Sequence, residues 1–281
     1  MNWLNIAVVG GINLDVIGQP SGPFKPRDSL IGSVRFSCGG VGHNIAAQAV
    51  RTGANVSFYS VFGDDHNAEW LRQACLSEGL RIDHSVSVTG ASAVYMAVHD
   101  TDGDMLCAVN DMRLMDGFTP DILAPMLPSV NRADVCVIDA NLPVESLLYL
   151  AERATIPLVC DPVSAEKAQR IIPLMKHLSA LKPNLLEAQS MTGETTPEAC
   201  GRALLDMGAK NVFISLGKDG LYYADDSESG YLRPKTLTSV PMNGAGDAMT
   251  AGIASGIGLR YGVLETAKLG METVSRYLHL A

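Results

Sequence analysis

Short apolar runs alternate with longer amphipathic segments along most of the chain. The apolar runs have the length and continuity of buried strands in a parallel sheet. They lie at residues 4–10, 56–62, 133–140, 157–160, 178–182 and 212–216. The segments between and after them favour helix, and several end at a glycine. These predicted helices lie at residues 41–53, 68–79, 144–153, 185–191, 197–207, 245–259 and 263–280. The alternation predicts an α/β fold in which helices cover both faces of a parallel sheet.

Two regions interrupt this alternation. Residues 28–36 and 91–110 have the pattern of antiparallel strands, and the second contains the polar turn sequence HDTDGD at 99–104 between two apolar runs. Such a polar stretch with a glycine is a hairpin signal. We therefore expect a small β-sheet that projects from a single domain spanning residues 1–281.

Composition and charge narrow the class of protein. The chain has 281 residues, of which 47% are hydrophobic and 18% charged, so it is long enough for one large folded domain. A net charge of -9 argues against non-specific binding to nucleic acid or to anionic membranes. No apolar run approaches the roughly 18–20 residues of a membrane span. The first ten residues have the pattern of a strand and lack the basic leader of a signal peptide, so a cytoplasmic location is expected.

The cysteines do not form a pattern that predicts metal binding. Six are present, none in a CxxC pair, and most lie in apolar stretches, so we expect them to be buried, reduced thiols. A zinc site needs ligands at short spacing, and the six histidines do not supply them.

The strongest chemical signal is NGAGD at 243–247, directly before a predicted apolar helix. Small residues let the backbone approach a ligand, and the first N–H groups of the helix can hold an anion. Asp247 could then accept a proton from a hydroxyl beside that anion. The alternative is an Asp that only caps the helix.

Two further polar segments lie near the N-terminus. CGGVGHN at 38–44 is a glycine-rich turn before a helix, against which a polyhydroxy ligand could lie, with Asn44 as donor and acceptor. It fits neither a dinucleotide fingerprint nor a Walker loop. GGINLD at 10–15 follows the first strand, where α/β proteins place ligand loops, and Asp15 could accept bonds from sugar hydroxyls. Simple polar turns remain the alternatives for both.

Two more segments lie in the second half. In KPNLLE at 182–187, Asn184 and Glu187 share one helical face and could orient Mg²⁺-bound water; a helix cap is the alternative. SLGKDG at 215–220 follows an apolar strand and could wrap a nucleotide or form a plain turn.

The order of these motifs resembles that of the PfkB/ribokinase family of carbohydrate kinases. The resemblance covers nearly the whole chain, and its GAGD and GGxGxN motifs are specific. It implies a Rossmann-like, three-layer α/β sandwich with a small β-sheet lid, whose strands lie within residues 12–36 and 90–112. It also implies ATP and Mg²⁺ as cofactors, a monovalent cation such as K⁺ near GAGD, and a homodimer formed through the lid.

The resemblance assigns a role to each matching residue. It implies that Asp247 is the catalytic base and that the N–H groups of Gly244, Ala245 and Gly246 form an anion hole. The implied substrate-side residues are Asn13, Asp15, Gly39, Gly40 and Asn44. The implied nucleotide-side residues are Asn184, Glu187, Ser215, Gly217 and Gly220, with Glu187 acting on Mg²⁺ through water.

Within the family, the stretches at 40–46, 108–112, 161–167 and 181–188 look most like those of pseudouridine kinases. This implies phosphorylation of the ribose 5′-hydroxyl of pseudouridine. Lys167 would then reach a uracil-like carbonyl or a phosphate, with a solvated helix lysine as the alternative. Two other functions stay open: a ribokinase-like or other nucleoside kinase, and a catalytically silent binding protein on the same scaffold.

The chain departs from the family pattern at a few positions. Asn243 replaces the usual Thr before GAGD, and Pro241 replaces an Asp or Asn, which bears on the monovalent-cation loop. His43 stands where relatives often carry a basic residue. The sequence stops at Ala281, where relatives continue with segments that wall the adenine. This leaves three expectations. The adenine pocket is more open than in relatives, the affinity for nucleotide is weaker, or the chain is a shortened variant.

Overall fold

A computed structural model describes residues 3–234 and 244–280 of the chain. Within these residues the largest sheet has eight strands in the order β14-β13-β12-β11-β10-β9-β1-β4. The strands from β4 to β12 run parallel, and β13 and β14 add an antiparallel edge. The bounds of the sheet strands are β1 (Asn5–Val9), β4 (Asn55–Tyr59), β9 (Val135–Asp139), β10 (Leu158–Asp161), β11 (Ala180–Leu181), β12 (Val212–Ser215), β13 (Leu221–Ala224) and β14 (Ser229–Leu232).

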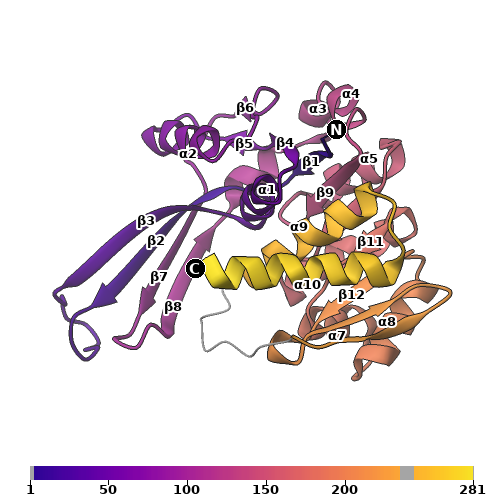
Figure 1. Ribbon diagram of the computed structural model, residues 1–281. Coiled ribbons are helices and arrows are strands. Elements are labelled where there is room, and N and C mark those ends of the chain that lie inside the picture. The colour runs from indigo at the N-terminus through magenta and orange to yellow at the C-terminus, as the bar shows by residue number, and fades with distance from the viewer. Residues whose placement is uncertain (1–2, 235–243, 281) are drawn as a thin grey trace.

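Helices cover both faces of this sheet, as the alternation of apolar runs predicts (Figure 1). Alternate residues of β1 enter two separate cores: Ala7 and Val9 pack on one face, and Ile6 and Val8 on the other. The helices on the first face are α3 (Pro120–Leu123), α4 (Leu127–Val130), α5 (Val144–Arg153), α6 (Ala165–Ala168), α7 (Leu185–Thr192) and α8 (Pro197–Asp206). Those on the second face are α1 (Val41–Arg51), α2 (His66–Ser77), α9 (Ala245–Gly258) and α10 (Val263–Leu280). The result is the three-layer sandwich that we predict from the sequence.

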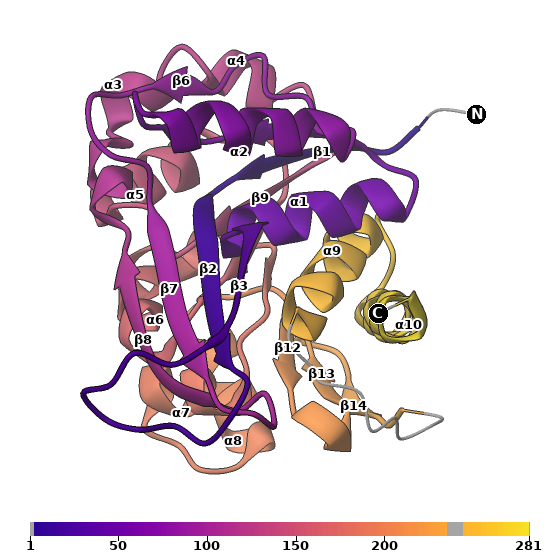
Figure 2. The same cartoon turned by 90° about the vertical axis from the view of Figure 1, so that its left-hand side faces the viewer.

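A second sheet projects from one side of this body (Figure 2). We call it the small sheet; its order is β3-β2-β7-β8. It consists of β2 (Asn13–Pro20), β3 (Gly32–Gly39), β7 (Val94–His99) and β8 (Met105–Asp111). The antiparallel prediction is correct for each hairpin and wrong for the sheet as a whole, because β2 and β7 pair in parallel. The chain crosses over through the main body between the two hairpins, which brings β7 alongside β2 in the same direction.

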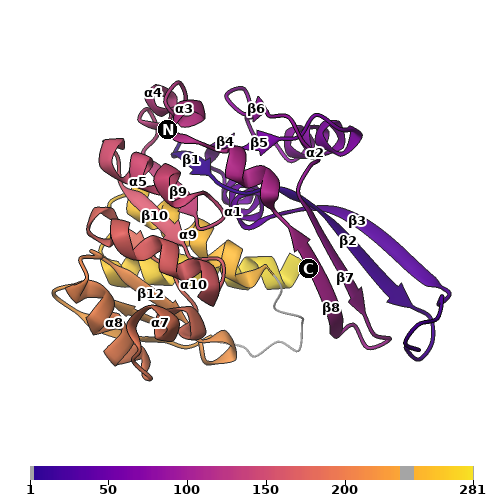
Figure 3. The same cartoon turned by 180° about the vertical axis from the view of Figure 1, so that it is seen from behind.

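The carboxyl ends of the parallel strands form the edge where ligand sites are expected. β1 lies between β9 and β4, so the strand order reverses beside β1. In open α/β sheets, ligands bind outside the carboxyl ends of the strands at such a switch point. The small sheet rises from this same side, as Figure 3 shows from behind. The expected ligand crevice is therefore the region between the carboxyl edge of the main sheet and the base of the small sheet.

Several elements lie outside the sequence prediction. The edge hairpin of β13 and β14, the short helices α3 and α4, and the strand β6 (Val86–Ser87) were not expected. The strand predicted at 56–62 is divided into β4 and the short strand β5 (Val61–Phe62). The 3-10 helices are η1 (Arg113–Gly117), η2 (Gln169–His177) and η3 (Gly217–Asp219). The expectation of buried cysteines is wrong for Cys107, which is exposed on β8, and for Cys38, which is partly exposed on β3. Among the described residues, no helix is long and apolar enough to span a membrane.

Candidate active site

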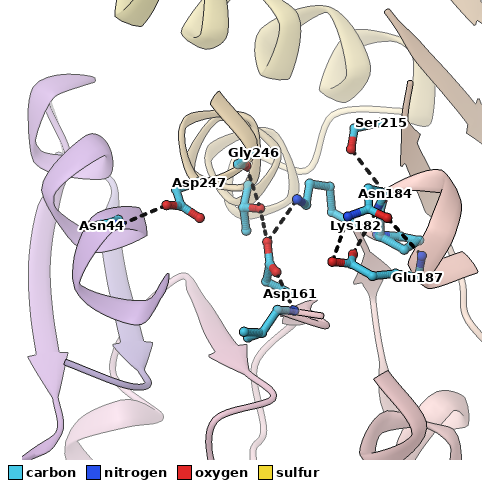
Figure 4. A network of polar contacts seen from close by, with 11 residues as sticks. Asn44, Asp161, Lys182, Asn184, Glu187, Ser215, Gly246 and Asp247 are labelled. Atoms are coloured by element: carbon cyan, nitrogen blue, oxygen red, sulfur yellow. Dashed lines mark hydrogen bonds and ion pairs between the residues drawn. The ribbon is translucent and has the colours of Figure 1, made fainter. Parts of the chain in front are cut away.

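Asp247 lies in the first turn of α9, at the carboxyl edge of the main sheet. Gly244 precedes the helix with a φ of 79°, a left-handed conformation that glycine adopts without strain. The N-cap residue of α9 is Gly244, so Asp247 does not occupy the cap position itself and lies in the first turn. Instead, the side-chain amide of Asn44 donates a hydrogen bond of 3.0 Å to Oδ2 of Asp247 (Figure 4).

The surroundings of Asp247 favour its protonated form more than water does. Burial raises the pKa of Asp247 to about 7, and the carboxylates of Asp161 and Asp139 add to this rise. The ammonium of Lys182 and the hydrogen bond from Asn44 act in the opposite direction. A carboxyl with a pKa near neutral pH is suited to accept and release a proton under physiological conditions.

A buried ion pair lies directly beneath the first turn of α9. Nζ of Lys182 is 3.0 Å from Oδ2 of Asp161, and both side chains are only 6% exposed. The hydroxyl of Thr250 donates to the same oxygen at 2.8 Å. A Cβ on Gly246 would come within 3.3 Å of Lys182 Nζ, so the ammonium group lies against the backbone of the GAGD turn. The helix N-terminus and this lysine together place positive potential at one point.

Lys182 keeps its charge in spite of this burial. Burial alone lowers the pKa of its ammonium, but the carboxylates of Asp161 and Glu187 outweigh that effect and raise it. Removal of either partner would leave an unpaired charge in a dry environment.

Asp139 at the end of β9 forms the floor of the crevice. Its two oxygens accept 2.8 Å bonds from the backbone N–H groups of Gly11 and Asn141. A Cβ on Gly10 or Gly42 would come within 2.7 Å of this carboxylate or closer, so glycine is required at both positions. Burial raises the pKa of Asp139 to about 6.

The predicted substrate-side residues gather where β2, β3 and α1 meet. Nδ2 of Asn13 donates to Oδ1 of Asp15 at 2.6 Å. A Cβ on Gly39 would overlap the Asp15 carboxylate, and Gly40 has a φ of 97° against the backbone of Gly11. The turn therefore needs glycine for two separate reasons, close approach and positive φ. Burial raises the pKa of Asp15.

Lys167 lies on α6, after β10, and contacts the loop that follows β9. Its Nζ donates to Oδ1 of Asn141 at 2.6 Å, and burial lowers the pKa of this lysine. The side chain is thus partly buried and directed to the β9 loop, which is not the behaviour of a solvated helix lysine.

Asn184 and Glu187 form a complete capping box at the start of α7. The Asn184 side chain accepts from the backbone N–H of Glu187 at 2.9 Å, and the Glu187 carboxylate accepts from the backbone N–H of Asn184 at 2.8 Å. The helix-cap alternative is therefore realised. It does not exclude a ligand role, because Glu187 is only 5% exposed and its pKa is raised by burial and by Asp161.

The loop after β12 adjoins this cap. Ser215 forms a β-bridge with Asn184, so the two nucleotide-side segments lie next to each other. Gly217 and Gly220 have φ of 60° and 100°, and they bound the 3-10 turn η3. The segment at 215–220 therefore does form a turn, as the alternative interpretation predicts. This turn lies at the carboxyl edge of the sheet.

The structure separates the sequence-predicted residues into two groups. Asn13, Asp15, Gly39, Gly40 and Asn44 lie at the base of the small sheet, and Asn184, Glu187, Ser215, Gly217 and Gly220 lie toward β12. Asp247 and the GAGD backbone lie between them. Asn243 and Pro241, which bear on the monovalent-cation loop, lie outside the described residues.

Sequence reasoning missed the charged residues in the middle of the site. Asp139, Asp161 and Lys182 each end or follow a parallel strand, and Asn141 and Thr250 support them. A charged side chain at the last residue of a buried apolar run was the available signal, because the carboxyl ends of parallel strands meet at one edge.

Comparison with known proteins agrees with this geometry. The sequence profile of the pfkB family carbohydrate kinases matches residues 4–275. A pseudouridine kinase of Escherichia coli (strain K12) is 33% identical over 258 residues, which cover 89% of this chain and 82% of that protein. The family match includes the strands of both sheets and Asp247.

Solved structures share the fold. A ribokinase from Thermotoga maritima superimposes with a TM-score of 0.88 at 20% identity, covering 98% of this chain and 93% of that one. A ribokinase of Arabidopsis thaliana, solved with ribose and ATP, has a TM-score of 0.84 at 20% identity and covers 99% of this chain and 93% of that one. The fold is therefore ribokinase-like.

Proposed function

We propose, from the premise that this chain belongs to the pfkB family of carbohydrate kinases, that it transfers the γ-phosphoryl group of ATP to the ribose 5′-hydroxyl of pseudouridine. Membership of the family makes the protein a phosphotransferase with an alcohol as acceptor; the substrate is our proposal. The observation that carries the mechanism is the position of Asp247, with a raised pKa, in the first turn of α9, beside the first backbone N–H groups of that helix.

Asp247 serves as the general base in this proposal. The substrate hydroxyl lies between Asp15 and Asp247 and gives its proton to the Asp247 carboxylate as the phosphoryl group arrives. Asn44 holds that carboxylate in place through its 3.0 Å hydrogen bond. General-base assistance of this kind contributes about 10²–10⁴-fold to a rate.

The GAGD backbone forms the anion hole for the transferring phosphoryl group. The first N–H groups of a helix have no partner within it, so those of Ala245 and Gly246, together with Gly244 before them, are available to phosphoryl oxygens. The ammonium of Lys182, held against Gly246 by Asp161, adds a full positive charge next to this hole.

The sugar lies against the turn at the base of the small sheet. Asp15 and Asn13 supply polar atoms for ribose hydroxyls, and the glycines at 39 and 40 leave room for the ring. Lys167 and Asn141, joined at 2.6 Å, would contact the carbonyl groups of the base from the opposite side.

The nucleotide side of the crevice fits Mg²⁺–ATP. Glu187 and Asp161 offer buried carboxylate oxygens, which Mg²⁺ prefers as ligands, usually through retained waters. Mg²⁺, when bound, neutralises charge on the phosphates, and Glu187 would hold its water shell. The adenine would lie in a hollow of about 470 Å³ between the end of β14 and the face of α10, lined by apolar side chains such as Leu232, Met271 and Leu278.

The small sheet carries a second surface suited to a second copy of the chain. Residues that pair across strands point to the same face, and one such row contains Phe36, Val16, Met96 and Val109. Phe36 and Val109 are 61% and 62% exposed. The neighbouring row, with Asp15 and Asn110, points to the other face, toward the substrate. A homodimer through the apolar face would leave the substrate-side face of each small sheet free.

A substrate panel tests the proposed reaction. ADP release is measured with ATP and Mg²⁺ in the presence of pseudouridine, uridine, ribose or fructose 6-phosphate, and the position of the new phosphate is determined on the product. We expect the highest kcat/KM with pseudouridine and phosphate at the 5′ position. A clear preference for ribose would assign a ribokinase-like activity, and no turnover with any acceptor would indicate a silent binding protein.

A further inference from the structure

Two cysteines and a histidine from three different elements meet behind the substrate turn. Cys38 ends β3, His43 lies in the first turn of α1, and Cys75 lies in the last turn of α2. Their ligand atoms all lie within 4.8 Å of one another. The spacing along the sequence gives no such signal, because three separate elements contribute the residues.

Glu78 adds a fourth potential ligand. It follows α2 three residues after Cys75, so both side chains lie on one face of the helix end. Oε2 of Glu78 is 2.8 Å from Nε2 of His43. The His43 side chain is only 3% exposed, whereas that of Glu78 is 34% exposed and can admit an ion from solvent.

The chemistry of this set matches a borderline-soft divalent cation. Zn²⁺ binds Cys sulfur, His nitrogen and carboxylate oxygen, with four ligands in most sites. We propose that Cys38, His43, Cys75 and Glu78 form a binding site for a divalent transition-metal ion of the Zn²⁺ class. The site is separate from the Mg²⁺ position, which contains only oxygen donors.

The cluster is connected to Asp247 by a continuous chain of side-chain contacts. With a metal on Nε2 of His43, the proton of the ring resides on Nδ1, which lies 3.3 Å from Oδ1 of Asn44. Nδ2 of Asn44 in turn donates to Asp247. An ion at this site therefore fixes the orientation of the Asn44 amide, and through it the position of Asp247.

Cobalt binding tests the site directly on the whole protein. Co²⁺ is titrated into the reduced protein, and the thiolate-to-cobalt charge-transfer bands are recorded together with the stoichiometry. We expect one Co²⁺ per chain with these bands, displaced by Zn²⁺. The double variant Cys38→Ser/Cys75→Ser, which has no cluster thiolate, should lose the bands, while Cys107→Ser, which removes the exposed thiol of β8, should keep them. Absence of thiolate bands in the wild-type protein, or their persistence in the double variant, would overturn the proposal.

A second measurement needs no variant and so does not depend on whether the altered proteins fold. The wild-type protein is alkylated with iodoacetamide, with and without Zn²⁺, and each cysteine is quantified by peptide mapping. We expect Zn²⁺ to slow alkylation of Cys38 at least tenfold and to leave Cys107 unchanged. Equal rates at Cys38 with and without Zn²⁺ would contradict the site, whether or not the protein is an active kinase.

Discussion

The side-chain amide of Asn44, on α1, donates a 3.0 Å hydrogen bond to the carboxylate of Asp247, on α9. The two residues are 203 positions apart in the sequence, and each follows a glycine-rich turn. The bond therefore joins the substrate side of the crevice to the GAGD turn. It gives Asn44 a second role beside the predicted contact with substrate, because the same amide orients the proposed base.

The proposed base should give the reaction an acid limit near neutral pH. Burial and the carboxylates of Asp161 and Asp139 raise the pKa of Asp247 to about 7, against the effects of Lys182 and Asn44. Only the ionised form accepts a proton, so kcat/KM should fall about tenfold for each pH unit below this value. A pH profile between 5 and 9 at fixed free Mg²⁺ checks this. A flat profile from pH 5 to pH 7 would be incompatible with the assignment.

The raised pKa of Asp247 should also make the free energy of unfolding depend on pH. An acid whose pKa is higher in the folded state than in the unfolded state binds its proton more tightly when folded. The folded state therefore loses stability as the pH rises from the unfolded-state pKa of 3.8 to the folded-state pKa of about 7. Asp247→Asn removes this penalty, and one pKa unit corresponds to about 1.4 kcal/mol. The variant should therefore be more stable than the wild type at pH 8, by an amount on the order of 2–4 kcal/mol. The difference should shrink toward pH 4.5. Urea unfolding at several pH values measures it, and a difference that grows toward low pH would have the wrong sign.

The ion pair beneath α9 should be far more important for stability than the pairs on the surface. Lys182→Met leaves the buried Asp161 carboxylate without its partner, a change that costs about 3–5 kcal/mol in comparable cases. The matched control is Lys268→Met, which breaks the exposed 2.6 Å pair with Glu265 and should leave the free energy of unfolding almost unchanged. Denaturant unfolding of both variants at pH 7 provides the comparison. Equal losses in the two variants would mean that Lys182 does not compensate a buried charge.

The apolar row on the small sheet should hold two copies of the chain together. Phe36→Asp places a charge in the centre of the exposed row and should convert the protein to a monomer at micromolar concentration. Tyr261→Asp is the control, because Tyr261 is 50% exposed at the far side of the main body, before α10. Light scattering coupled to size exclusion measures the mass. A wild-type monomer, or a Phe36→Asp dimer, would refute this interface.

Much of the main sheet follows from the sequence because its strands are continuous apolar runs between helices. The helices at 144–153 and 263–280 have the predicted bounds, and those at 185–191 and 245–259 differ by one residue at one end. The edge hairpin of β13 and β14 was missed, because its second strand has only four residues, is partly exposed and contains a glycine, which is depleted in strands.

The charged centre of the site could not be predicted in the same way. Each of the motifs at 182–187 and 243–247 consists of residues that are neighbours in the sequence, so both can be recognised from the sequence alone. The pairing of Lys182 with Asp161, and the approach of Asp139 to the turns at 10–11 and 42, depend on which strands become neighbours. The metal-type cluster of Cys38, His43 and Cys75 has the same origin, since three elements contribute to it.

The most direct test of the account is the turnover of Asp247→Asn. Phosphorylation of pseudouridine by ATP is followed in the wild-type protein and in the variant, and the dissociation constants of both substrates are measured separately. Loss of a general base predicts a fall in kcat of about 10²–10⁴-fold, with both dissociation constants changed less than about threefold. A variant that keeps more than a tenth of the wild-type kcat while binding both substrates would contradict the role of Asp247 as the base.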